Sequence, residues 1–149
     1  MLLITHLLFG LFLGKLLGNI LLVAIGAVIV DIDHVYMYLQ SGMIFYPRKL
    51  LASMLAPHDP YGTQRTVAHS LFAWIVVTIA LALVNKQYAG FISIGYLSHL
   101  LIDAIDNDDM QLMFPLKGHI RGPVVYNSRV EYIIDVILVA VIFIFLYII

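Results

Sequence analysis

The sequence predicts an all-α membrane protein, a polytopic bundle of about five apolar helices with a polar site at one membrane face. Of the 149 residues, 62% are hydrophobic, and the mean hydropathy is +1.00. The apolar residues lie in long runs, and the last run, counted from residue 130 to 149, reaches the roughly 20 residues needed to span hydrocarbon. A chain of this length is expected to form one domain, residues 1–149.

The helices are expected where the apolar runs fall. The runs lie at about 2–14, 18–30, 68–84, 88–103 and 130–149, separated by polar loops at 35–67 and 104–129. The glycines and Asn19 between the first two runs favour a turn, which makes these runs a hairpin. The short polar connection at 85–87 predicts that the third and fourth helices form an antiparallel pair. The N-terminal run has no A-x-A-like cleavage site and is expected to be retained.

Composition excludes several kinds of chemistry. A formal net charge of −1 gives no bulk attraction to nucleic acid. The chain has no cysteine, so disulfides, thiolate metal sites and cysteine nucleophiles are all excluded. A bound metal ion must therefore be held by histidine and carboxylate side chains.

The basic residues predict the orientation in the membrane. Six of them lie in or beside the two long loops, whereas the opposite side was assigned Lys86 alone. The six are Arg48, Lys49, Arg65, Lys117, Arg121 and Arg129. By the positive-inside rule, both loops and the polar site are expected to face the cytoplasm from the plasma (inner) membrane.

Ionisable residues gather at the loop ends of the apolar runs. These are Asp31, Asp33 and His34 after the second run, His69 at the start of the third, and His99 and Asp103 in the fourth. His99 and Asp103 share one helical face because they are four residues apart. His6 joins this level if the first two runs form a hairpin. Ionisable residues inside apolar segments are costly and mark functional sites.

The shared level of these residues predicts a metal site. Histidine with carboxylate is the ligand set of cysteine-free zinc or manganese sites. The expected ligands are His6, Asp33, His34, His69, His99 and Asp103. Each residue also has a simpler interpretation: a lone histidine in an apolar run is usually a core residue, and residues 31–34 alone equally fit a solvated helix end.

Other polar features are expected to be structural. His58 and Asp59, followed by Pro60, read as a turn, and His119 gives no stronger signal. The aromatic and methionine residues at 36–38 are expected at the membrane interface. The acidic run 106–109 reads as a solvated loop or helix cap, and its spacing does not fit a calcium loop.

Several motifs resemble the YdjM-like family of membrane-bound metal-dependent hydrolases. They occur in order along nearly the whole chain. The motifs are Thr5-His6, Asp31-Ile32-Asp33-His34, Arg65 with His69-Ser70, the Gly95-to-Asp103 element that contains Ser98-His99, and Phe114-Pro115. The Gly-Tyr-Leu-Ser-His-x-x-x-Asp element is the most specific of them. This family is in turn thought to be related to the zinc-dependent phospholipase C and single-strand nuclease group.

This resemblance implies a multinuclear His/Asp zinc-type site and phosphoester hydrolysis. The chain departs from the family pattern at three places, with Val30 for proline, Gln64 for histidine, and residues 107–109 for a glycine-containing stretch. The first change lies beside the Asp-x-Asp-His motif, the second removes one ligand, and the third alters the region after the His-x-x-x-Asp helix.

Two further residues are expected to take part in catalysis. Asp31 would orient a ligand histidine or act as general base. Arg65, with Lys117 or Arg121 behind it, would hold a phosphate group through its planar pair of donors. The expected substrate is a phospholipid or a lipid-linked phosphate that reaches the site from the membrane.

Two other functions use the same residues. In a non-catalytic scaffold, the metal would only pin the helices together while the 35–67 loop binds a cytoplasmic partner. A metal-handling or transport protein would spread its ligands along a path through the bilayer, whereas these ligands gather at one end.

Overall fold

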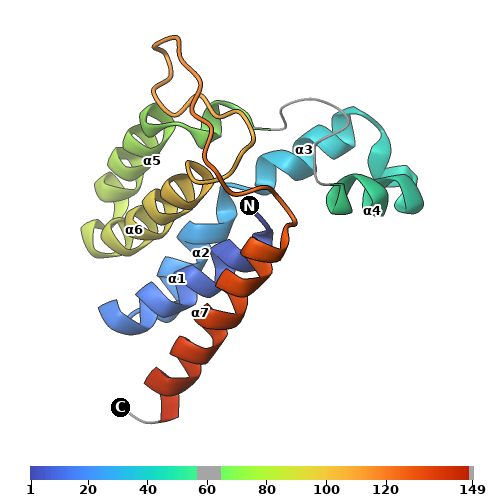
Figure 1. Ribbon diagram of the computed structural model, residues 1–149. Coiled ribbons are helices and arrows are strands. Elements are labelled where there is room, and N and C mark those ends of the chain that lie inside the picture. Colours follow the sequence, from blue (N-terminus) through green and yellow to red (C-terminus); the bar gives the residue numbers. More distant parts are fainter. Residues whose placement is uncertain (57–64, 148–149) are drawn as a thin grey trace.

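The computed structural model describes residues 1–56 and 65–147, and these residues are mainly helical (Figure 1). The elements in chain order are α1 (Leu3–Leu17), α2 (Ile20–Ile29), α3 (Ile32–Gln40), η1 (Met43–Phe45), α4 (Pro47–Leu55), η2 (Val67–His69), α5 (Leu71–Val84), α6 (Lys86–Asp103) and α7 (Arg129–Tyr147). Within the described ranges there is no strand, only isolated bridges that pair Asp106 with Val124 and Met110 with Ile120. The all-α prediction is confirmed.

Each predicted apolar run contains one helix of the bundle, namely α1, α2, α5, α6 and α7. The first predicted loop, in contrast, is not simply polar coil, because it contains α3, η1 and α4. In α3 the apolar residues Ile32, Val35, Tyr36 and Leu39 recur at helical spacing, and Pro47 begins α4 at a position that needs no backbone donor. That local pattern explains why the segment is helical.

Both predicted hairpins are present. Gly18 ends α1 with a φ of +80°, a conformation that glycine adopts without steric cost, and the Asn19 side chain accepts a hydrogen bond from the Leu22 N–H at the start of α2. Asn85 likewise caps α6 by accepting from the Gln87 and Tyr88 N–H groups. The first hairpin returns the start of α1 to the end of α2, where Asp31 lies (Figure 1).

Helix α2 lies at the centre of the bundle and packs closely on α1 and α6. A Cβ on Gly26 would lie 2.2 Å from the Ile92 carbonyl oxygen, and one on Gly95 would lie 2.1 Å from the Val23 carbonyl oxygen. Glycine is therefore required at both positions for this approach of α2 and α6. Nearer the loops, the core continues through a buried cluster of Val30, Tyr96, Leu100, Met110 and Leu112.

The number of membrane spans is not confirmed. In the described ranges, one helical stretch, Ile20–Gln40, is long and apolar enough to cross a membrane, and it comprises α2 and α3. Helices α1 and α5 are apolar but shorter, with 15 and 14 residues. Helix α7 contains Arg129, Glu131 and Asp135 in its first two turns. A bundle of five spanning helices therefore remains a prediction.

The two ends of the bundle differ in charge. Lys15, in the last turn of α1, lies at the same end as Lys86, so the opposite side carries two basic residues rather than Lys86 alone. The count of six basic residues at the loop end against two at the opposite end still favours a cytoplasmic position for the loop end. His58 and Asp59, expected to form a turn, and Gln64, expected to replace a ligand, lie outside the described residues.

Candidate metal centre

The predicted ligands come together at the loop end of the bundle. They lie at the start of α1, at the junction of α2 and α3, in η2 and near the end of α6. The side chains of His6, His69, His99 and Asp103 are almost completely buried. Asp31 and His34 lie at the junction of α2 and α3 and are partly exposed, with 14% and 28% of their side chains accessible. The open side of the cluster therefore faces the start of α3.

His99 is oriented by the close packing of α2 and α6. Helix α2 ends in a tighter turn, in which the Asp31 N–H donates to the Val28 carbonyl oxygen at 3.2 Å. The Ala27 carbonyl oxygen accepts a hydrogen bond from His99 Nδ1 at 2.8 Å. Because a carbonyl oxygen only accepts, Nδ1 carries the proton, and Nε2 of a neutral His99 has a free lone pair.

His69 is oriented by a carboxylate. Its Nδ1 donates to Asp33 Oδ2 at 2.9 Å. The same oxygen accepts from the Thr66 hydroxyl at 2.8 Å and from the Thr66 N–H at 3.2 Å. Asp33 thus holds the ring of His69 from behind and directs Nε2 into the cluster, an arrangement common around metal-binding histidines.

The two Nε2 atoms face each other. Those of His69 and His99 are 3.2 Å apart. Asp103 Oδ2 lies 3.4 Å from the first and 3.5 Å from the second. Asp31 Oδ1 lies 3.8 Å and 3.6 Å from the same two atoms. Two imidazole rings and two carboxylates thus converge on one buried space that could hold a cation.

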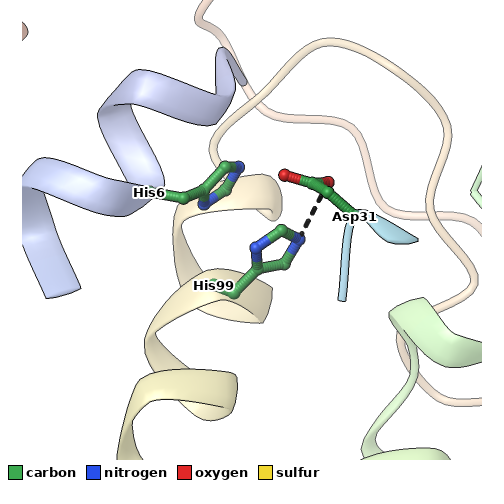
Figure 2. Close-up of side chains that lie close together, drawn as sticks. All are labelled: His6, Asp31 and His99. Carbon is green, nitrogen blue, oxygen red and sulfur yellow. Dashed lines mark ion pairs between the residues drawn. The ribbon is translucent and has the colours of Figure 1, made fainter. Parts of the chain in front are cut away.

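The potential ligand atoms form three overlapping groups, each spanning no more than 4.8 Å. The groups are His6, Asp31 and His99; Asp31, His34 and His69; and His69, His99 and Asp103. Figure 2 shows the first group, in which the carboxylate of Asp31 lies beside the rings of His6 and His99. Because three residues belong to two groups each, the three groups form one connected cluster that could hold a metal ion.

His6 gives a further indication of a missing partner. Its ring stacks on that of His99 with centroids 3.8 Å apart. Its Nε2 lies 3.1 Å from Asp103 Oδ1. Neither ring nitrogen of His6, nor Nδ1 of His34, has a hydrogen-bond partner among the described residues. Buried polar atoms are rarely left unpaired, so these nitrogens are suited to a ligand role.

Arg65 lies beside the cluster with 7% of its side chain exposed. Its Nε is 3.2 Å from Asp103 Oδ2, and its Nη2 is 2.6 Å from Asp106 Oδ2. Its Nη1 donates to the Asp108 carbonyl oxygen at 2.8 Å. The Met1 amine also contacts both carboxylates, at 2.9 Å from Asp103 and 2.7 Å from Asp106.

Neighbouring charges and burial shift the pKa values of two groups outside the apolar helices, Arg65 and His69. Burial lowers the pKa of Arg65, but Asp103 and Asp106 raise it by more, so the guanidinium stays charged. Burial also lowers the pKa of His69, whereas the hydrogen bonds with Asp31 and Asp33 and the charge of Asp103 raise it to about 9. Without a metal ion, the His69 ring is therefore protonated on both nitrogens and positively charged at neutral pH.

Two completely buried carboxylates were not expected from the sequence. Asp106 was placed in a solvated loop or cap, but it is completely buried, because Arg65 and the Met1 amine neutralise it. Glu131, on α7, is also completely buried and accepts hydrogen bonds from the Leu2 and Asn127 N–H groups and the Thr5 hydroxyl. Glu131 thereby fixes the start of α1 and, one residue after Thr5, His6. The sequence feature that could have indicated a role for Glu131 is its position as an acidic residue inside an apolar run.

The remaining predicted residues lie apart from the cluster. His119 is exposed, and its Nε2 is 3.5 Å from the Gln111 amide nitrogen. Arg121 forms a paired salt bridge with Asp109 at the surface, so it does not stand behind Arg65. Lys117 is exposed. None of the three belongs to a described group of metal-ligand atoms.

The sequence was compared with known proteins and families. A family model described as YdjM inner membrane protein matches residues 1–149, the whole chain. Neither the curated proteins nor the solved structures contain a match.

Proposed function

We propose that this chain, which belongs to the YdjM inner membrane protein family, is a metal-dependent hydrolase that cleaves a phosphoester at the membrane surface. The observation that carries the proposal is the pair of histidine Nε2 atoms 3.2 Å apart, each with its Nδ1 hydrogen-bonded to an acceptor. Two nitrogen ligands at about 2.0–2.1 Å from a tetrahedral zinc ion are separated by roughly 3.4 Å. The donor set therefore fits a divalent metal, zinc or manganese.

The residues divide into ligands and supports. We propose that the metal ligands are drawn from His6, Asp31, His34, His69, His99 and Asp103. We propose that Asp33, expected from the sequence to be a ligand, supports His69, since its Oδ2 accepts from His69 and Thr66 and Asp33 belongs to none of the three groups of ligand atoms. Asp31, expected to orient a histidine or act as base, contacts both Nε2 atoms and takes the ligand position.

A divalent metal ion held there supplies Lewis acidity and lowers the pKa of a coordinated water. The protein residues orient the ligand atoms. Asp33 and the Ala27 carbonyl keep the protons of His69 and His99 on Nδ1, so that Nε2 of each ring is available.

The position of the open side supports a lipid substrate. Asp31 and His34 lie at the start of α3, the helix that leaves the bundle, and the chain belongs to an inner membrane protein family. A phospholipid or lipid-linked phosphate has its phosphate at the boundary between membrane and water, where this site is expected to lie. The excess of basic residues at this end supports a cytoplasmic orientation.

Arg65 has two alternative roles. The sequence analysis assigned it to phosphate binding, but all three of its nitrogens contact protein acceptors. We propose that Arg65 positions Asp103. In that case Arg65→Ala weakens metal binding along with turnover, whereas a phosphate-binding arginine would affect turnover at full metal content.

One alternative function has a specific observation in its favour. Four of the candidate ligands are almost completely buried, as in a structural zinc site that is closed by four protein ligands. In that case the metal would hold the helices together in a membrane scaffold. Partial exposure of Asp31 and His34 favours the hydrolase.

The test is turnover per bound metal. Purified protein in lipid nanodiscs is loaded with zinc or manganese and incubated with phospholipids and a chromogenic phosphodiester. Wild type and His119→Ala, which changes a histidine outside the cluster, are expected to hydrolyse one of these substrates, and His99→Ala is expected to be inactive. If wild type holds metal but its rate equals that of His99→Ala on every substrate, the scaffold function is favoured.

A further inference from the structure

The segment from Ile32 to residue 56 projects from the bundle as an arm made of α3, η1 and α4 (Figure 1). The arm begins one residue after Asp31, at the end of the bundle where the metal centre lies. Its first turn carries Asp33 and His34, which belong to the metal centre, and near its far end the Met54 carbonyl oxygen accepts a hydrogen bond from the Tyr126 hydroxyl. We infer that this arm lies in the headgroup layer of an anionic lipid leaflet.

Apolar exposure on α3 supports this inference. Ile32, Val35, Tyr36 and Leu39 are spaced as one helical stripe, and their exposed fractions lie between 48% and 66%. These four large side chains therefore leave much of an apolar stripe accessible on one face of α3. An apolar patch of this kind marks an interaction surface.

The connection and α4 continue the apolar surface. Phe45 is 77% exposed and Tyr46 is 59% exposed at the tip between the two helices. On α4, Leu51 and Met54 are exposed on one face. Exposed aromatic residues next to a helical apolar stripe are typical of segments at the membrane–water boundary.

The charge of the arm selects an anionic partner. Between residues 35 and 56 the charged side chains are Arg48 and Lys49, with no aspartate or glutamate. Both basic residues are exposed, and Lys49 Nζ lies 5.0 Å from the centre of the Tyr46 ring. On the α4 helix Lys49 lies opposite the face of Leu51 and Met54, and Arg48 lies at the edge of that face. The arm is thus apolar on one face and basic on the other, which fits anionic phospholipid better than a cytoplasmic protein surface.

This placement fixes the depth of the metal centre. Since α3 begins next to Asp31, an arm held in the headgroup layer holds the open side of the cluster, Asp31 and His34, at the same level. The inference does not require that the centre hydrolyses anything, and its test uses no activity measurement.

The absence of cysteine allows a direct test, because each introduced cysteine is the only one in the chain. Nitroxide labels are attached to Phe45→Cys, Leu51→Cys and Ala52→Cys in nanodiscs that contain phosphatidylglycerol. Accessibility to oxygen is compared with accessibility to a water-soluble nickel complex. Ala52 is the matched control, because it is exposed and adjacent to Leu51 but lies on the basic face of α4.

Labels at 45 and 51 are expected to be more accessible to oxygen, and the label at 52 to nickel. Replacing phosphatidylglycerol with phosphatidylcholine, or Arg48 and Lys49 with glutamine, should shift the labels at 45 and 51 toward nickel. At about 1 kcal/mol per basic residue near an anionic surface, the double replacement lowers the lipid-bound to water-exposed ratio about 25-fold.

Equal nickel accessibility at positions 45, 51 and 52 in anionic nanodiscs would overturn the inference, because the arm would then lie in water, free for a protein partner. Protection from both reagents at 45 and 51, with short distances between labels on different chains, would also overturn it. That result would assign the surface to a second copy of the chain.

Discussion

Replacement of Asp33 by asparagine separates a supporting carboxylate from a metal ligand. Asp33 Oδ2 accepts three hydrogen bonds, from His69 Nδ1 and from the hydroxyl and N–H of Thr66, at 2.8–3.2 Å. Asparagine keeps the size of the side chain but loses its negative charge, and an amide nitrogen facing these donors would repel them. His69 would then lose the partner that fixes its ring.

The expected loss of zinc affinity follows from the supporting role of Asp33. Replacing a group that supports a metal-binding histidine typically costs 10–100-fold in metal affinity. That range corresponds to about 1.4–2.8 kcal/mol. We therefore expect Asp33→Asn to weaken zinc binding by this amount, and Asp31→Asn and Asp103→Asn, which remove candidate ligands, to weaken it by more than 100-fold.

The assay is competition for zinc between the purified protein and a chromogenic chelator, with far-UV circular dichroism to verify folding. Asp109→Asn is the matched control, because Asp109 is a surface carboxylate paired with Arg121 and is expected to leave affinity unchanged. An Asp33→Asn protein with wild-type affinity would refute the supporting role. A loss as large as that of Asp103→Asn would instead show that Asp33 is a ligand, as the sequence first indicated.

Two other predictions concern packing and pH. Gly95→Ala should lower the melting temperature and weaken zinc binding, because its Cβ would lie 2.1 Å from the Val23 carbonyl oxygen, and overpacking of this kind costs about 1–3 kcal/mol. Gly90→Ala, where nothing lies within 4 Å, should not destabilise the protein, and equal melting temperatures for the two variants would contradict the packing argument. The raised pKa of His69, about 9, means that zinc must displace a proton at lower pH, so zinc affinity should rise with pH and level off above pH 9. Calorimetry in buffers of different ionisation enthalpy should detect proton release at pH 7, and zinc binding without it would contradict the protonated state of His69.

The sequence predicted the level of the cluster well because helical geometry determines it. Apolar runs of known length, with turns at Gly18 and Asn85, necessarily return His6, His69 and His99 to one end of the bundle. The i, i+4 spacing of His99 and Asp103 likewise required no tertiary information. Both features depend on local spacing, which a single sequence contains.

The roles of individual carboxylates were beyond the sequence. Asp31 and Asp33 are two residues apart at a helix junction, and the angle between α2 and α3 decides which one approaches the Nε2 atoms of His69 and His99. Asp106 looked solvated because its partners, Arg65 and the Met1 amine, are distant in sequence. The helix α3 did have a local signal, the apolar spacing from Ile32 to Leu39, but the polar residues around it favoured a loop.

The central claim is that the buried His/Asp cluster binds a divalent metal ion. Elemental analysis of protein purified in detergent, after removal of loosely bound ions, measures it most directly. We expect zinc or manganese at one or more equivalents in wild type and in His119→Ala, and a clear loss in His99→Ala and Asp103→Ala. The same metal content in all four proteins, or none in wild type after incubation with either metal, would contradict the account.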